Sequence, residues 1–374
     1  MKILFLARYL PQEGSTTHIY TIAKELIDRE NEVYIISAGP KKEEGAIKIF
    51  EEITNYGVKH YKVNFPLNPH FSILGKIHQL YKYIIATPKV MYIMFKLKPD
   101  IIHVHYPVTS YLAKIYTKIT GKKFITTHHI SGIPKHILHK KADYVIAISR
   151  DLQEELLRKF KYNNEQVKLI FNGVSKEKFN KKISQEVKQN IKIKLNLPID
   201  RPIIGFVGSL IKRKGIDILL EACSKITDIN FHIVLVGDGD KNWLMNLIDK
   251  FKLADRVSIF PFQDPVKFYS IFDIFVLPSR KEGFALVPIE AMMMGVPTIR
   301  SNVEGANDQI KHNINGFIFK NEDSQELSKY IRLLLENDEL RKSMGQKARL
   351  YAIDRFSADI MINKLIQLYK EALK

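Results

Sequence analysis

Short apolar runs alternate with amphipathic helical segments along most of this chain, and that alternation restricts the folds open to it. Near the N-terminus, a strand predicted over residues 2–7 leads to a helix over about 16–29 and a second strand over 33–37. Apolar runs of this kind are typical of parallel strands that are buried on both faces. The pattern predicts a parallel α/β sheet with helices on both sides.

The same alternation restarts near Ile203, after a stretch rich in lysine and asparagine over residues 181–201 that we interpret as a linker. A chain of 374 residues usually forms more than one core. We therefore predict two doubly wound, Rossmann-like domains, residues 1–180 and 202–357, which face each other across a cleft. A last helix over residues 358–374 is expected to pack back on the first domain.

Composition and charge narrow the class of protein. The chain is 45% hydrophobic and 26% charged, as ordinary globular proteins are. Cys223 is the only cysteine, which excludes an internal disulfide, and no apolar run has the length of a signal peptide or a membrane span. We expect a cytoplasmic protein. The net charge of +18 favours an anionic partner: nucleic acid, anionic lipid or a phosphorylated substrate.

The stretch over residues 273–299 places its polar residues between a predicted strand and a predicted helix, where parallel sheets bind ligands. Glu282 opens the turn, and the backbone amides that follow it suit a phosphate. These amides belong to Gly283, Phe284, Ala285 and Leu286. Glu290, in the helix, can hold vicinal hydroxyls, as acidic residues hold ribose in other nucleotide folds. The alternative is a surface loop with two solvated glutamates.

Two other turns carry candidate phosphate-binding features. Arg213 and Lys214 follow a predicted strand and could neutralise a leaving diphosphate, although a solvated basic loop is the alternative. Gly14, in the loop after the first strand, would let the backbone approach a ligand. Residues 236–239 form a glycine-containing turn that we interpret as lying near a nucleotide, because the full dinucleotide fingerprint is absent.

Several histidines lie on or near predicted strands. His103, His105 and His128 could form a zinc cluster, but no cysteine or carboxylate at a recognised spacing supports one. We therefore expect no metal site, and histidines that form hydrogen bonds instead. His128, at the carboxyl end of its strand, is the candidate for contact with a substrate.

Residues 70–98 are basic, aromatic and helical in period. Such a segment could lie on an anionic membrane, or it could pack on the sheet with its lysines solvated. Pro88 is expected to divide it into two helices.

Together these stretches resemble the GT-B fold glycosyltransferases of family 4, which are retaining enzymes that use nucleotide sugars. The resemblance covers nearly the whole chain. It rests on Pro11–Gly14, Asp100–His105, Thr127–His128, Asn172–Val174, Phe206–Gly208 with Lys214–Gly215, Val236–Gly239, and Glu282–Phe284 with Glu290–Met292. Three positions depart from the family pattern, Ser15, Ser209 and Glu304, where relatives carry glycine, arginine and glycine.

The resemblance implies a role for each candidate residue. Glu290 would bind the donor ribose and Glu282 the donor sugar, while the amides of residues 283–286 would hold the diphosphate. Lys214, with Arg213, would stabilise that diphosphate as it leaves. His128 would contact sugar hydroxyls, and Gly14 would let the backbone approach the phosphates. Gly208 and Gly237 would belong to turns that bind the donor. Metal would not be needed, and retention would follow from attack on the face that the diphosphate leaves.

We therefore predict a retaining glycosyltransferase that uses a UDP- or GDP-sugar. Its acceptor would be a glycan, in particular one that is lipid-linked or phosphorylated. The protein would lie peripherally on the inner face of an anionic membrane. One alternative within the fold is a sugar epimerase or a phosphorylase. Another is a non-enzymatic protein that binds membrane or nucleic acid, although no nucleic-acid motif is present and no nucleic-acid partner is expected.

Overall fold

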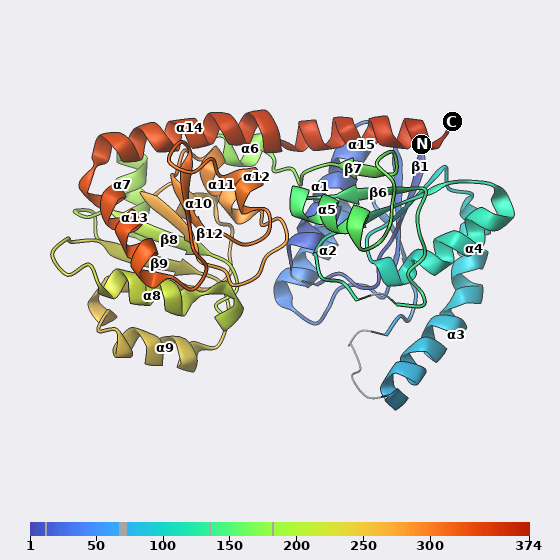
Figure 1. Cartoon of the computed structure of the whole chain (residues 1–374), viewed down its shortest axis with the longest axis horizontal. Helices are drawn as coiled ribbons and strands as arrows, with labels where there is room; N and C mark the ends of the chain where they lie inside the picture. The colour runs from blue at the N-terminus through green and yellow to red at the C-terminus, as the bar shows by residue number, and fades with distance from the viewer. Residues whose placement is uncertain (12, 67–72, 135, 182) are drawn as a thin grey trace. The chain divides into compact units, whose positions relative to one another are not determined.

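A computed structural model of the chain describes residues 1–11, 13–66, 73–134, 136–181 and 183–374 (Figure 1). The chain forms two compact units: unit 1 contains Met1–Gly173 and Ala358–Lys374, and unit 2 contains Val174–Ser357. The boundary after Gly173 precedes the one expected at residue 180. The reason is α6 (Lys176–Phe179), whose Phe179 is buried and lies edge-on against Tyr269 of unit 2.

The segment interpreted as a linker also contains regular structure. Helix α7, Gln185–Lys194, begins at Ser184, whose hydroxyl caps the backbone N–H of Val187. None of the residues of α7 is buried. This explains its polar, lysine-rich sequence, because a helix with no buried residue needs no apolar stripe.

Unit 1 is built on a parallel sheet with the strand order β3-β2-β1-β4-β5-β6-β7 among its described residues. The strands are β1 (Lys2–Leu6), β2 (Glu32–Ser37), β3 (Lys59–Lys62), β4 (Ile101–Val104), β5 (Phe124–His128), β6 (Tyr144–Ala147) and β7 (Val167–Leu169). Its helices are α1 (Gly14–Ile27), α2 (Glu44–Asn55), α3 (Ile73–Leu97), α4 (Ser110–Thr120), α5 (Arg150–Arg158) and α15 (Ala358–Ala372).

Both faces of this sheet are buried, as the apolar runs predict. Ile3 and Phe5 of β1 belong to a core shared with α1 and α15, whereas Leu4 and Leu6 belong to a core shared with α3 and α4. Successive side chains of a strand point to opposite faces, so one apolar strand supplies both cores. The C-terminal helix α15 is tied to the sheet by Tyr369, whose hydroxyl lies 2.7 Å from Nδ1 of His103.

Helix α3 runs through Pro88 without a break, so the expectation of two helices is wrong. An internal proline costs a helix about 3 kcal/mol. Packing offsets that cost, because buried residues lie on both sides of Pro88: Tyr83, Ala86, Val90 and Met94. The part of the predicted segment over residues 70–72 lies outside the described residues.

Unit 2 repeats the architecture with the strand order β10-β9-β8-β11-β12-β13 among its described residues. The strands are β8 (Ile203–Val207), β9 (His232–Val236), β10 (Val257–Phe260), β11 (Ile274–Leu277), β12 (Thr298–Ser301) and β13 (Gly316–Phe319). The further helices are α8 (Ile216–Ser224), α9 (Lys241–Lys250), α10 (Val266–Tyr269), α11 (Val287–Met293), α12 (Ala306–Gln309), α13 (Ser324–Glu336) and α14 (Asp338–Phe356).

All strand pairs formed by the described residues of the two sheets are parallel, which confirms the predicted pair of Rossmann-like domains. The strand order reverses direction beside β1 in unit 1 and beside β8 in unit 2. Ligands of doubly wound sheets bind near such points, at the carboxyl ends of the strands. Among the described helices, none is both long enough and apolar enough to cross a bilayer.

Candidate active site

In unit 2, the turn after β11 brings Glu282 against Lys214. Oε1 of Glu282 accepts hydrogen bonds from Nζ of Lys214 at 2.5 Å and from Oγ of Ser279 at 2.7 Å. Lys214 ends the 3-10 turn η2 (Lys212–Lys214), which follows β8. Because β8 and β11 are hydrogen-bonded neighbours, the turns at their carboxyl ends meet. The side chains of Lys214 and Glu282 are only 14% and 8% exposed, so water screens this pair weakly.

The pair keeps Glu282 ionised. Burial acts to raise the pKa of Glu282, but the charge of Lys214, the hydrogen bonds from Lys214 and Ser279 and the charge of Arg300 outweigh it, so the pKa is lowered. An ammonium group has three N–H donors, and this contact uses one of them. Lys214 is therefore held in a fixed position with donors left for a second anion.

Arg280 holds the two turns together. Its guanidinium donates to both carboxylate oxygens of Asp217, at 2.8 and 2.9 Å, and to both of Glu322, at 2.6 and 2.8 Å. It also donates to the backbone carbonyl of Lys212 at 2.6 Å. The planar, bidentate contacts hold Arg280 against α8 and the turn after β13, and the bond to Lys212 links the turn after β11 to the turn after β8. Arg280 therefore positions Lys214 from outside the pair.

Arg213 does not join the buried pair. Its side chain is exposed, and Nη1 donates to the carbonyl of Lys281 at 3.3 Å. Its own carbonyl accepts the backbone N–H of Arg280 at 2.9 Å. Of the two predicted cations, the structure therefore brings Lys214 to Glu282 and leaves Arg213 at the surface of the same turn.

Glu290 lies in the first turn of α11 and is 9% exposed. Its Oε2 accepts a hydrogen bond from the hydroxyl of Tyr269 at 2.7 Å. Burial raises the pKa of Glu290, and the charge of Asp264 adds to this, while Tyr269 and Lys178 act to lower it. Tyr269 was not anticipated from the sequence. A buried tyrosine needs a hydrogen-bond partner, and that requirement is the signal that could have found it.

Arg300 is another residue that sequence reasoning missed. It is fully buried in β12, where its guanidinium donates to Oε1 of Gln309 and to the carbonyl of Glu304 at 3.0 Å. Gln309 in turn donates to the carbonyl of Ala285 at 2.7 Å. Arg300 thus supplies positive charge near Glu282 and, through Gln309, fixes the backbone before α11. The visible signal was an arginine directly after the predicted strand that ends at Ile299.

The predicted amide segment has buried side chains. Phe284 and Leu286 are 5% and 8% exposed, and the ring of Phe284 lies edge-on to that of Phe356 at 5.6 Å. Only the backbone of these two residues can therefore contact a ligand. Ala285 and Gly283 are partly exposed.

The predicted glycines differ in how strongly the fold requires them. A Cβ on Gly237 would lie 2.0 Å from the carbonyl oxygen of Gly208, and the φ angles of Gly237 and Gly208 are 150° and 147°. No other residue type fits Gly237 without moving this backbone. A Cβ on Gly14, at the start of α1, would meet no atom within 4 Å. Packing among the described residues therefore does not explain the glycine at position 14.

In unit 1, His128 and His103 occupy separate environments. His128 is buried at the end of β5, edge-on to Phe160 with the ring centres 5.4 Å apart, and burial lowers its pKa to about 4. His103 uses both ring nitrogens, in contacts of 2.7 Å with Tyr369 and with Oγ1 of Thr127. The trio considered from the sequence, His103, His105 and His128, is therefore not the set that the fold assembles.

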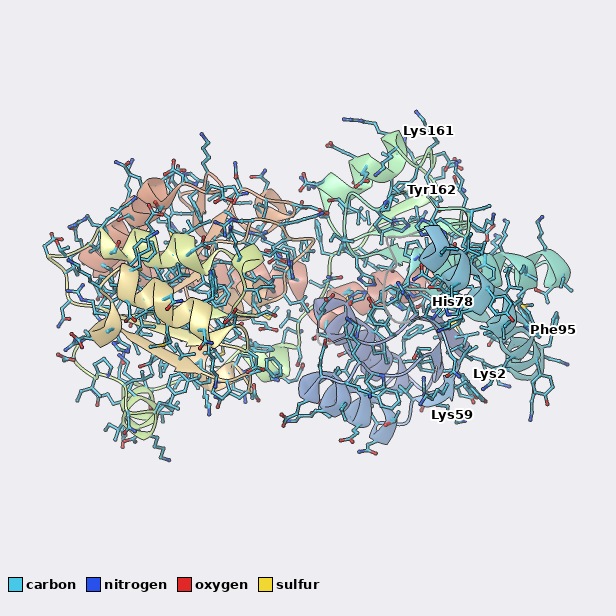
Figure 2. The ribbon with its side chains drawn as sticks, turned by 90° about the horizontal axis from the view of Figure 1, so that it is seen from below. Lys2, Lys59, His78, Phe95, Lys161 and Tyr162 are labelled. Atoms are coloured by element: carbon cyan, nitrogen blue, oxygen red, sulfur yellow. The ribbon has the colours of Figure 1, made fainter. Side chains whose placement is uncertain are left out.

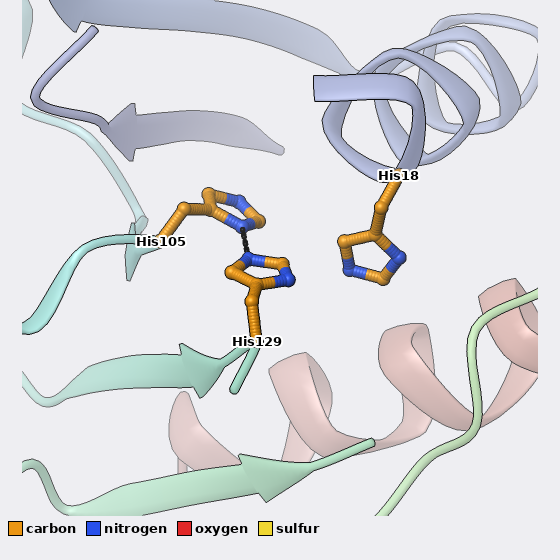
Figure 3. A group of neighbouring side chains, drawn as sticks. All are labelled: His18, His105 and His129. Atoms are coloured by element: carbon orange, nitrogen blue, oxygen red, sulfur yellow. Dashed lines mark hydrogen bonds between the residues drawn. The ribbon is translucent and has the colours of Figure 1, made fainter. Parts of the chain in front are cut away.

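The histidines that do come together are His18 of α1, His105 after β4 and His129 after β5 (Figure 3). One ring nitrogen from each lies within 4.8 Å of the others. Nδ1 of His105 is 3.4 Å from Nε2 of His129. Burial lowers the pKa of His18 to about 3 and those of His105 and His129 well below the usual range, so the three imidazoles are neutral at pH 7.

Two family models match the chain. The model described as Glycosyltransferase Family 4 covers residues 13–178, and the model described as Glycosyl transferases group 1 covers residues 187–351. The two matched ranges fall on unit 1 and unit 2 apart from a few residues at the boundary.

Individual proteins are similar over most of the chain. A capsular polysaccharide biosynthesis glycosyltransferase of Staphylococcus aureus is 27% identical over 71% of this chain and 72% of its own. The N-acetyl-alpha-D-glucosaminyl L-malate synthase of Bacillus anthracis is 25% identical over 100% of this chain and 98% of its own. Among solved structures, Anabaena HepE in complex with UDP has a TM-score of 0.83 at 22% identity, covering 99% of this chain and 100% of that one.

Proposed function

Because the chain belongs to the GT-B fold glycosyltransferases, we propose that it moves a sugar from a UDP- or GDP-sugar to an acceptor and retains the configuration of the anomeric carbon. The observation that carries this proposal is the buried pair of Lys214 and Glu282 at the carboxyl edge of the unit 2 sheet. The complex of Anabaena HepE with UDP supports a nucleotide as the donor group.

Each part of the donor has a proposed partner in the chain. Glu290 accepts hydrogen bonds from the ribose hydroxyls, and Glu282 contacts the donor sugar. The backbone amides of residues 283–286 face the diphosphate, and the turns that contain Gly208 and Gly237 lie along the nucleotide. Lys214 donates its remaining N–H groups to the diphosphate. Gly14 in unit 1 leaves room for the phosphates, and His128 contacts sugar hydroxyls.

The proposed chemistry needs charge stabilisation and no redox step. The bond between the anomeric carbon and the diphosphate oxygen breaks, and the acceptor oxygen attacks from the same face. The acceptor proton passes to an oxygen of the departing diphosphate. Negative charge grows on that group as the bond breaks, and a cation already in place stabilises it without reorganisation. Lys214 fills this role, with Arg213 contributing from the surface, so we propose that transfer proceeds without a metal ion.

Nucleotide release tests this proposal. The purified chain is incubated with UDP-, GDP- and ADP-sugars in the presence of a chelator, and released nucleotide is measured. We expect release from one donor type, and about a 100-fold loss in Lys214→Ala. Lys212→Ala is the matched control, since Lys212 is an exposed lysine of the same turn. Equal rates in the two variants, or no release from any donor, would contradict the proposal.

The same assay separates the alternatives within the fold. An epimerase would interconvert the donor sugar without an acceptor, and a phosphorylase would depend on inorganic phosphate. Release that instead rises with an added sugar acceptor identifies transfer.

We propose that the acceptor lies at an anionic membrane and that α3 contacts that surface. Apolar side chains of α3 are exposed opposite its buried face. They are Leu74, Ile77, Tyr81, Ile84, Ile85, Tyr92 and Phe95, with exposures of 81, 59, 58, 59, 57, 66 and 40%. Exposed lysines at 82, 89, 96 and 98 flank them, and the sequence contains no acidic residue from Ile73 to Lys98. Figure 2 labels Phe95 at the outer side of unit 1.

The electrostatic part of this contact can be estimated. Each lysine near an anionic surface contributes about 1 kcal/mol, so four contribute about 4 kcal/mol at low salt. Flotation with phosphatidylcholine vesicles, with and without phosphatidylglycerol, measures the binding of the chain to a membrane surface. We expect binding to the anionic vesicles only, lost in Ile84→Glu and kept in Ile119→Glu, which alters an equally exposed apolar residue of α4. Equal flotation of the two variants would refute the α3 contact but leave sugar transfer untouched.

A further inference from the structure

We propose that His18, His105 and His129 form a binding site for one divalent transition-metal ion of the zinc type. The site lies within unit 1 and does not depend on the proposed donor chemistry of unit 2. Its ligands come from three separate elements: α1, the residue after β4 and the residue after β5. Figure 3 shows the three rings grouped between these elements, with the contact between His105 and His129 drawn as a dashed line.

The spacing of the nitrogens fits a tetrahedral ion. Zinc binds imidazole nitrogen at about 2.0–2.1 Å, which places two nitrogens of one tetrahedral site about 3.3 Å apart. Nδ1 of His105 and Nε2 of His129 are already 3.4 Å apart. The nitrogen contributed by His18 lies within 4.8 Å of the other two, so its side chain has to move closer to them for all three histidines to bind one ion.

The hydrogen-bond partners of the three rings also point to a ligand. Neither ring nitrogen of buried His18 has a hydrogen-bond partner among the described residues, and the same is true of Nε2 of His105. Buried polar atoms are nearly always paired, so an unpaired imidazole requires an explanation. The long contact between His105 and His129 satisfies only one nitrogen of each ring. A metal ion would accept the lone pair of His18, which no donor among the described residues uses.

The chemistry of the ligands selects the class of ion. Imidazole nitrogen suits zinc, cobalt, nickel and copper, whereas magnesium and calcium require oxygen ligands. Neighbouring His103 is not a ligand, because its two ring nitrogens are hydrogen-bonded to Tyr369 and Thr127. Its ring packs against that of His105, with the ring centres 4.2 Å apart. Three histidines leave one tetrahedral position for water or an anion. Bound metal would tie α1 to the carboxyl edge of the sheet.

Cobalt and zinc titration of the untagged, full-length chain tests the site after dialysis against a chelator. We expect one Co²⁺ per chain with the intense visible absorption of tetrahedral coordination, displaced by one equivalent of Zn²⁺. Zinc should raise the melting temperature of the wild type, because an ion that binds only the folded chain stabilises it.

Two ligand variants and one control make the result specific. His18→Gln and His129→Gln should each weaken zinc binding at least about 100-fold and abolish the zinc-dependent rise in melting temperature. The control is the double variant His136→Gln/His139→Gln, which removes another neighbouring histidine pair of unit 1, with ring centres 5.4 Å apart, and should bind zinc as the wild type does. His129 is partly exposed, so its variant tests the site even if His18→Gln fails to fold. Stoichiometry well below one, or binding lost only in the control, would overturn the proposal.

Discussion

Replacing Lys214 with alanine would leave a buried carboxylate without its cation. Glu282 is 7% exposed and would keep the hydrogen bond from Ser279, but it would lose the ammonium group at 2.5 Å. Breaking one side of a buried ion pair costs about 3–5 kcal/mol, because the remaining charge stays in a low dielectric. We expect the unfolding free energy of unit 2 to fall by about that amount in Lys214→Ala. Combining it with Glu282→Gln should restore about 2 kcal/mol, since the orphaned charge is removed.

The loss should depend on pH. In the wild type the pKa of Glu282 is lowered, so its contribution to stability is present above the unfolded pKa of about 4.3 and is lost as the pH falls through the folded value. Without Lys214, burial becomes the dominant influence and raises the pKa of Glu282. The folded state then binds more protons than the unfolded state, and stability falls as the pH rises. The difference between wild type and Lys214→Ala should therefore be larger at about pH 7.5 than at about pH 5.

Tryptophan fluorescence during urea unfolding measures this in the right part of the molecule. Trp243 is the only tryptophan of the chain and lies in α9 of unit 2, so its emission follows the unit that carries Lys214. Lys212→Ala is the control and should change stability by less than about 0.5 kcal/mol. If the two alanine variants unfold at the same urea concentration, or if the gap between wild type and Lys214→Ala does not grow with pH, the buried pair does not have the energetic role assigned to it.

Three further predictions follow from individual contacts. Tyr269→Phe removes the hydrogen bond that acts to lower the pKa of Glu290, so the pH dependence of the KM for the donor should move to higher pH. About 1–2 kcal/mol of stability should also be lost. An unchanged pH dependence of this KM would show that Glu290 does not bind the donor. Gly237→Ala places a Cβ 2.0 Å from a backbone oxygen and should lower the melting temperature sharply, whereas Gly14→Ala, which meets open space, should melt like the wild type; equal melting would contradict the close approach at Gly237. Arg280→Ala should cost about 2 kcal/mol and lower kcat, while Arg332→Ala, whose partners Asp228 and Glu336 are exposed, should cost less than about 1 kcal/mol; urea unfolding of both variants decides between them.

Sequence reasoning reached the architecture because the deciding signals are local. The apolar character of β1, and the glycine-rich turns after β8 and β9, are visible in short stretches of sequence. The same local reasoning failed at Pro88, where helix propensity predicts a break. The continuous helix depends on Tyr83 and Val90, which pack on a sheet whose strands are distant in sequence.

The candidate site was only partly visible before folding. Glu282 and Glu290 could be located, since their places between a strand and a helix are a local feature. Their pairing with Lys214 and Tyr269 could not be predicted, because these two side chains reach them from other turns and helices. Arg300 follows the strand predicted from the sequence, and only the structure shows it buried in β12 against Gln309.

By itself, the amino-acid sequence determined the alternation of strands and helices, the two parallel sheets and the polar turns at their carboxyl ends, since these depend on periodicity and on residues near one another. The tertiary structure alone decided which polar side chains meet. His18, His105 and His129 are separated by long stretches of chain, and their convergence depends on strand order and on the direction of each side chain after its strand ends. In a parallel sheet, neighbouring strands come from segments that are distant in the sequence. Contacts at the carboxyl ends of the strands are therefore set by the strand order, which no local pattern encodes.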